Sequence, residues 1–146
     1  MTKRPYVVLA VVAALVVILA VVAAIISSSR NEEASDLSTP SGVVHAYIRA
    51  LHEGDYVGAA ALFEPDSRCD ATELSMYTLA ESLHIRVVEE TIHGERATVR
   101  MEIEESYGGL FDGAWTHTEI FFLGAEGDSW VLTGAPWPAH YCDVED

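Results

Sequence analysis

The chain has 146 residues, a formal net charge of −15 and a mean hydropathy of +0.20. All 23 acidic side chains lie in residues 27–146, where only six arginines oppose them. Such an acidic surface repels phosphate backbones, so the composition excludes a nucleic-acid-binding function. The length leaves room for one compact domain and excludes a large multidomain enzyme.

An unbroken apolar run begins at Tyr6 and ends at Ile26. As a helix it spans about 31 Å, close to the hydrocarbon thickness of a bilayer. Lys3 and Arg4 precede the run and acidic residues follow it, so the positive-inside rule predicts a cytoplasmic N-terminus. The sequence therefore predicts a single-pass signal-anchor helix over 6–26 in the cell membrane, with the domain that follows on the outer, extracytoplasmic side.

The boundaries around this run follow from composition. Residues 1–5 are the expected cytoplasmic N-terminus, and residues 27–38, rich in serine and acidic side chains, predict a solvated extracytoplasmic tether. A single domain is expected over 39–146. A cleaved signal peptide is the alternative for the apolar run, although such peptides usually have an apolar core of about 7–15 residues.

The first helix of the domain is predicted from its ends. Thr39 and Pro40 are typical of an N-cap and first helical position, and Gly54 is typical of the residue after a helix. Gly42 stands where a glutamate would complete a capping box, which weakens the first turn. One apolar stripe supports this helix, consisting of Val43, Val44, Tyr47, Ile48 and Leu51.

Two more helices are expected before the strands begin. Asp55 can cap a helix over about 56–63, which Pro65 would stop. The residues from Asp70 onward have the spacing of a capping box and predict a third helix that ends near residue 83.

Alternating apolar and polar residues then predict four strands, at 85–92, 96–104, 114–123 and 130–133. Residues 93–95 form the expected hairpin turn between the first two. Three helices followed by a four-stranded antiparallel meander predict an α+β domain in which the helices pack on one face of the sheet.

The segment TPSGVVHAYIRALHEGDYVGAAALF, at residues 39–63, resembles the opening of the nuclear-transport-factor-2-like superfamily. GERATVRMEI at 94–103 and DSWVLTG at 128–134 resemble the hairpin and final strand of the same group. It looks most like the short extracytoplasmic lipoprotein-like members of unknown function. The resemblance implies a cone-like fold and sheets that can pair back to back.

Isomerases and cyclases of that superfamily use an Asp or His base with a Tyr or acidic donor. The residues that could take these roles are Asp112, His117 or His93 as base, and Tyr77 or Tyr107 as donor. None of them lies in a catalytic motif of the enzyme members, and the glycine-rich loop around Asp112 is typical of a turn. Catalysis is therefore not expected, and no cofactor is expected either.

In the strand expected at 114–123, His117 shares a face with Trp115, Glu119 and Phe121. Neither face of this strand is entirely apolar, so one of its sides could line a pocket. The tryptophans of the domain either complete the core or contact an apolar ligand. The residues of this possible pocket are Trp115, His117, Phe121, Trp130 and Trp137.

No metal site is expected. His45 and His52 are seven residues apart, which places them about 10 Å apart along a helix, too far for one shared ion. The acidic C-terminus lacks the alternating oxygen ligands and glycine of a calcium loop. It consists of Asp143, Glu145 and Asp146.

Cys69 and Cys142 are the only cysteines. In the extracytoplasmic location that the apolar run predicts, a lone pair of cysteines usually forms a bridge. Pro136 and Pro138 cannot continue a strand, so the tail must leave the sheet and a bridge would tie it to the helices. Two free thiols are the alternative.

From the sequence we expect a membrane-anchored, extracytoplasmic, non-catalytic domain that binds a small ligand, a cell-wall component or an envelope protein. One alternative is a small isomerase or cyclase-like enzyme of the resembling fold. The other is a structural homodimerisation module. The sequence does not choose the ligand.

Overall fold

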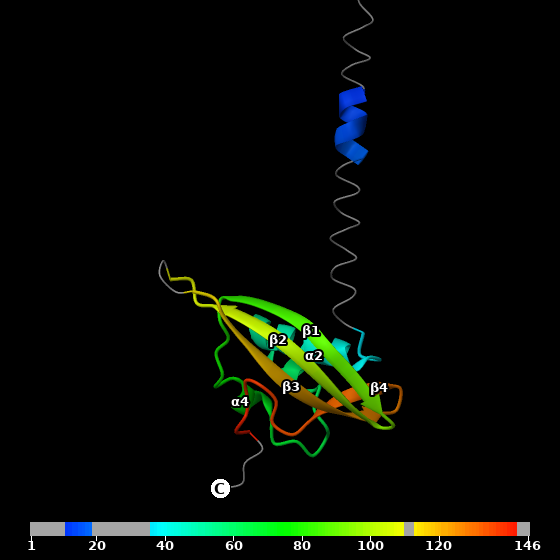
Figure 1. The fold of residues 1–146 in the computed structure, drawn as a ribbon, viewed down its shortest axis with the longest axis vertical. Helices are drawn as coiled ribbons and strands as arrows, with labels where there is room; N and C mark the ends of the chain where they lie inside the picture. Colours follow the sequence, from blue (N-terminus) through cyan, green and yellow to red (C-terminus); the bar gives the residue numbers. More distant parts are fainter. Residues whose placement is uncertain (1–10, 19–35, 110–112, 143–146) are drawn as a thin grey trace, which may run out of the picture. The chain divides into compact units, whose positions relative to one another are not determined.

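The computed structural model describes residues 11–18, 36–109 and 113–142. Contacts divide the chain into two units, Met1–Ala34 and Ser35–Asp146. All the described strands belong to the second unit (Figure 1).

The structure corrects the predicted membrane anchor. Of the span expected over 6–26, residues 11–18 are helical, and the rest lies outside the described residues, as do residues 1–5 and 27–35. Among the residues that are described, no helix is long and apolar enough to cross a membrane. This finding contradicts the predicted transmembrane helix, and with it the signal anchor and the cell-membrane location.

Helix α2, Pro40–Glu53, begins and ends at the residues that local chemistry favours. The Thr39 hydroxyl accepts a hydrogen bond from the backbone N–H of Gly42 at 3.1 Å. Gly54 follows the helix with φ of 75°, a left-handed conformation that favours glycine. A Cβ at Gly42 would overlap the backbone oxygen of Asp36, which explains why no glutamate completes a capping box there.

The other two helices are much shorter than predicted. Helix α3, Tyr56–Ala60, ends before residue 63 because the next residues pair with the last strand instead. Leu132 donates from its backbone to Leu62 at 2.8 Å and accepts from Glu64 at 3.0 Å. Helix α4, Ala71–Leu74, has a single turn, so the expected helix to residue 83 is wrong.

The sheet is a four-stranded antiparallel meander in the order β1-β2-β3-β4. Its strands are β1 Ser82–His93, β2 Arg96–Ser106, β3 Trp115–Glu126 and β4 Ser129–Thr133. β1 begins within the segment that the sequence assigned to a helix, because residues 82 and 83 pair with the end of β2. The predicted fold is therefore wrong in its helices, which are few and mostly short.

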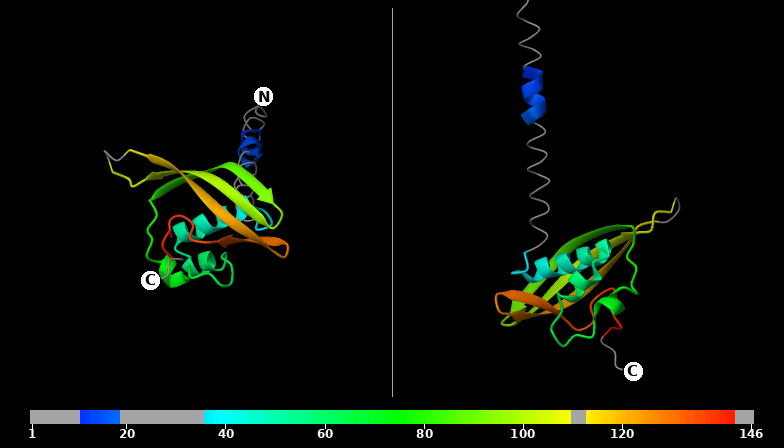
Figure 2. Two further views of the ribbon diagram at one scale, coloured as in Figure 1. Left: turned by 60° about the horizontal axis from the view of Figure 1, so that its bottom comes forward. Right: turned by 180° about the vertical axis from the view of Figure 1, so that it is seen from behind.

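One face of the sheet, termed the inner face, packs against α2 (Figures 1 and 2). Alternation along β2 buries every second side chain there, and Phe121 and Leu123 continue the buried surface on β3. Among the helices described within the second unit, none covers the opposite or outer face. The core lies between α2 and the inner face.

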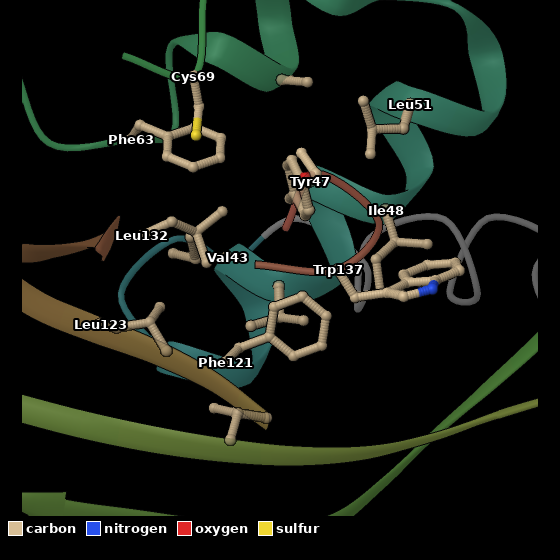
Figure 3. Packing of buried hydrophobic residues seen from close by; sticks show 14 of the residues in the cluster. Val43, Tyr47, Ile48, Leu51, Phe63, Cys69, Phe121, Leu123, Leu132 and Trp137 are labelled. Atoms are coloured by element: carbon tan, nitrogen blue, oxygen red, sulfur yellow. The ribbon is translucent and has the colours of Figure 1, made fainter. Parts of the chain in front are cut away.

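Tyr47 on α2 stands at the centre of this core (Figure 3). Its ring meets Phe63 and Phe121 edge-on, at centroid distances of 5.4 and 6.4 Å. Its hydroxyl is buried and has no hydrogen-bond partner among the described residues. Burial raises the pKa of Tyr47, with a smaller contribution from Tyr77.

Tyr47→Phe is expected to leave the free energy of unfolding unchanged or to raise it by up to about 1 kcal/mol. The reason is that a buried hydroxyl without a partner loses its water hydrogen bonds on folding. Urea unfolding of the wild type and the variant measures the difference. A loss of stability in the variant would show that the hydroxyl has a partner.

A pH dependence is expected from His45, which is half-buried on α2. Burial lowers the pKa of its imidazole below the ordinary value of 6.5, because the charged form loses hydration. The unfolded chain then binds more protons than the folded chain as the pH falls through 6.5. Stability is therefore lost in acid, and His45→Gln should reduce this loss. Urea midpoints across the pH range measure it, and identical profiles would contradict the expectation.

Cys69 and Cys142 form a disulfide, with their Cα atoms 5.1 Å apart. Cys69 lies in the loop before α4, and Cys142 lies in the tail that follows β4. Both are buried in the core cluster. The bridge therefore holds the tail beside α4, as Figure 1 shows.

Candidate functional site

Three titratable side chains gather on the inner face where β2 ends and β3 begins. Glu105 follows the buried positions of β2, and His117 and Glu119 precede Phe121 on β3. Their side chains are 6%, 11% and 22% exposed. We call Glu105, His117 and Glu119 the inner-face cluster.

The imidazole of His117 lies between the two carboxylates. Its Nδ1 is hydrogen-bonded to Glu119 Oε1 at 2.9 Å, and its Nε2 is 3.2 Å from Glu105 Oε2. Which of the two atoms donates in the first contact depends on the tautomer of the ring. The second contact is short enough for an ion pair but lacks hydrogen-bond alignment, which leaves the buried Nε2 without a hydrogen bond in the described structure.

Two tryptophans border the cluster. The ring of Trp115 stacks on His117 at a centroid distance of 4.5 Å and an interplanar angle of 19°. Trp137 meets the same imidazole at 5.5 Å from the tail that the disulfide fixes. Trp137 is 8% exposed and Trp115 is 61% exposed, so the stack opens to solvent at Trp115.

His140, also in the tail, brings its Nε2 to 4.0 Å from Glu119 Oε2. The groups of the cluster that reach solvent are therefore the Glu119 carboxylate and the indole ring of Trp115. In the described part of the chain, no three His, Cys, Asp or Glu side chains are placed to hold a metal ion.

A cleft of about 460 Å³ lies at the same end of the sheet, between the C-terminal end of α2 and residues 77–81. The strand pairs Ser82–Ser106 and Leu83–Glu105 place this cleft near the cluster. Its lining combines acidic and phenolic side chains, including Glu53, Glu81, Tyr56 and Tyr77.

The structure brings some of the site residues predicted from the sequence together and leaves others apart. His117, Trp115, Phe121 and Trp137 all lie on or against the inner face near one another. Trp130 lies on β4, partly buried against the core.

The other candidates are apart from the cluster. Tyr77 lines the cleft, Tyr107 is 60% exposed beyond the end of β2, and His93 is exposed at the hairpin. Asp112 lies outside the described residues, as does the acidic C-terminus from 143 to 146.

Sequence reasoning did not name Glu105, Glu119 or His140 as site residues, although it placed Glu119 on the same strand face as His117. Glu105 could have been found from the sequence. If the alternation of β2 is continued two residues beyond Ile103, it places Glu105 on the apolar face. No sequence pattern indicates His140, because its approach to Glu119 depends on the path of the tail after β4.

Comparison with known proteins finds a solved structure with a similar fold, but it assigns the chain to no family. No family model matches the chain, and no curated protein matches it. The fold is similar to the solution structure of RPA3114, a SEC-C motif containing protein from Rhodopseudomonas palustris. The two chains are 18% identical with a TM-score of 0.57, over 66% of this chain and 77% of that one.

These comparisons contradict the predicted membership of the nuclear-transport-factor-2-like superfamily. The matching segments of the sequence contain helix caps and core positions, which unrelated α+β domains share. The likeness to RPA3114 concerns the fold alone at this level of identity.

Proposed function

We propose that the chain is a non-catalytic binding domain that holds a small ligand at the inner-face cluster. The observation that carries the proposal is the Nε2 of His117, which is buried beside the Glu105 carboxylate without a hydrogen bond. Most buried polar atoms in proteins are paired, and an unpaired one calls for an explanation, of which a bound group is one. A few convergent polar groups among aromatic rings are also typical of a ligand site.

The proposal is tested on the full-length chain labelled with ¹⁵N in its histidine rings. The low-molecular-mass fraction of an extract from the producing cells is added, and the ring signals are recorded. We expect the Nε2 signal of His117 to shift, while the ring of His84, exposed on the outer face, stays unchanged. The Glu105→Gln variant should lose the response. An unchanged His117 signal in the wild type would refute the proposal.

A second candidate function is homodimerisation through the outer face. Ile120 and Phe122 are 44% and 57% exposed there, although they belong to a central strand. Three arginines and four glutamates occupy strand positions of this face, which is close to balance on a chain with a net charge of −15. These residues are Arg86, Arg96, Arg100, Glu89, Glu102, Glu104 and Glu126.

A second copy meets less like-charge repulsion on this face than elsewhere on such an acidic chain. Sedimentation equilibrium of the full-length wild type should therefore give a dimer, and Phe122→Glu should give a monomer. Val57→Glu, at a residue 73% exposed on α3, is the matched control and should remain dimeric. A monomeric wild type would exclude this function.

A further inference from the structure

The sheet contains a glycine, Gly124, that the fold of one chain does not require. It lies in β3 between Arg96 of β2 and Val131 of β4, and neither ladder has a bulge at this point. Its φ is not in the left-handed region, and a Cβ built on it would make only an ordinary contact, 3.6 Å from Cγ2 of Thr133. Glycine weakens the interior of a strand, and where it forms no bulge or bend it often marks a close approach by another backbone or a ligand.

The missing side chain leaves a cleft on the outer face beside an exposed aromatic ring. The cleft has a volume of about 610 Å³, and Thr98, Phe122 and Gly124 are among the outer-face residues that line it. Phe122 precedes Gly124 by two residues on β3, so both lie on the same face. The outer face thus carries a projecting ring and a hollow next to each other.

Register places the residues around this cleft in two rows that cross all four strands, and neither row contains a carboxylate. The row through Phe122, termed the Phe122 row, consists of Thr91, Thr98, Phe122 and Thr133. The next row, termed the Gly124 row, consists of His93, Arg96, Gly124 and Val131. Glu64 and Glu95 lie at the border of the cleft, outside both rows. On a chain with 23 acidic residues, the two rows form a place where another copy meets little like-charge repulsion.

We infer that two copies of the chain pair by inserting Phe122 of each copy into the cleft over Gly124 of the other. This inference rests on the homodimerisation proposed above and adds the contact by which the copies recognise each other. Sheets that pack face to face can keep their strands roughly aligned, and most homodimers have a two-fold axis across which one patch meets itself. An axis that lies between the sheets and crosses β3 at Leu123, perpendicular to the strand, places the Phe122 row of one copy on the Gly124 row of the other.

This arrangement suits the remaining side chains of both rows. Arg96 of one copy faces Thr98 of the other, and His93 faces Thr91, so the basic groups of the two rows do not oppose each other. An unrelated partner has to supply its own aromatic group for the cleft. A second copy already carries that group in the matching position, which favours a second copy as the occupant.

Filling the cleft tests the inference without changing Phe122. Gly124→Val adds a side chain where the single chain leaves room, so each copy should fold at least as stably, because valine favours strands. Sedimentation equilibrium of this full-length variant should nevertheless show a dimer at least about tenfold weaker than that of the wild type. Gly113→Val, before β3 and with open space around its Cβ, is the matched control and should pair as the wild type does.

A mixing experiment distinguishes insertion of the ring from a general effect on the outer face. Phe122→Ala removes the ring and keeps the cleft, whereas Gly124→Val keeps the ring and fills the cleft. Neither variant alone should pair well, but a mixed dimer still offers one ring and one open cleft. Native mass spectrometry of an equimolar mixture should therefore show the mixed dimer in about tenfold excess over either homodimer, where random pairing gives about twofold.

The outcomes separate this inference from the function on which it rests. A monomeric wild type would overturn homodimerisation and the inserted ring together. A dimeric wild type whose folded Gly124→Val variant pairs equally well, or a mixture that pairs at random, would overturn the inserted ring and leave homodimerisation standing. Circular dichroism verifies folding, and Thr98→Phe, which fills the same cleft from β2, replaces Gly124→Val if that variant does not fold.

Discussion

Replacing both Cys69 and Cys142 with alanine is expected to lower the free energy of unfolding by about 4 kcal/mol. The two cysteines are 73 residues apart, so their bridge closes a long loop and removes much chain entropy from the unfolded state. A loss of this size is a large share of the stability of a small domain. Urea unfolding of the full-length chain measures it.

Wild-type chain unfolded in the presence of a thiol reductant is the control, and its stability should approach that of the variant. A loss below about 1 kcal/mol in the double variant would contradict the structural role of the bridge. The bridge also concerns the site, because the tail it holds carries Trp137 against His117. We therefore expect the His117 response to ligand to weaken in the same variant.

In the monomeric chain, Phe121→Ala is expected to cost about 4 kcal/mol of stability, whereas Phe122→Ala is expected to change it by less than about 0.5 kcal/mol. The two phenylalanines are consecutive on β3 and point to opposite faces of the sheet. Phe121 is fully buried against Tyr47, and Phe122 is 57% exposed. Thermal and urea unfolding of both variants compare the two faces directly.

The pair is its own control, because the substitutions are chemically identical and adjacent. Similar losses in both variants would mean that the outer face is buried in solution. Concentration-dependent stability in the Phe122 variant would assign that burial to a second copy of the chain. A small loss in the Phe121 variant would contradict the register of β3.

Elements whose signals are local could be predicted from the sequence. The caps of α2 at Thr39 and Gly54 are short-range backbone chemistry, and they lie where the sequence places them. The alternation at 96–104 lies within β2, because a period of two describes a strand with one buried face.

Elements decided by distant contacts could not be predicted. Residues 62–64 leave α3 because Leu132, about seventy positions later, supplies their backbone hydrogen bonds. The apolar spacing after Asp70 is compatible with a long helix, but the chain turns after Leu74 and enters β1 at Ser82. Propensity yields to tertiary pairing in both places.

The candidate site was predicted in part, through its aromatic and imidazole members. The sequence placed Trp115, His117, Glu119 and Phe121 on one face of a strand, as β3 now has them. It did not indicate that Glu105 also contacts His117, because this depends on the pairing of Glu105 with Trp115 across β2 and β3. Register of this kind is set by the whole sheet and not by a local motif.

Native mass spectrometry of the full-length chain, purified from the cells that produce it, tests the binding function most directly. We expect a species heavier than the 15.9 kDa chain by the mass of one small molecule. In the His117→Ala variant we expect the mass of the chain alone, whereas His84→Ala should retain the molecule. A wild-type chain that carries nothing, or a molecule retained equally by His117→Ala, would contradict a ligand site at the inner-face cluster.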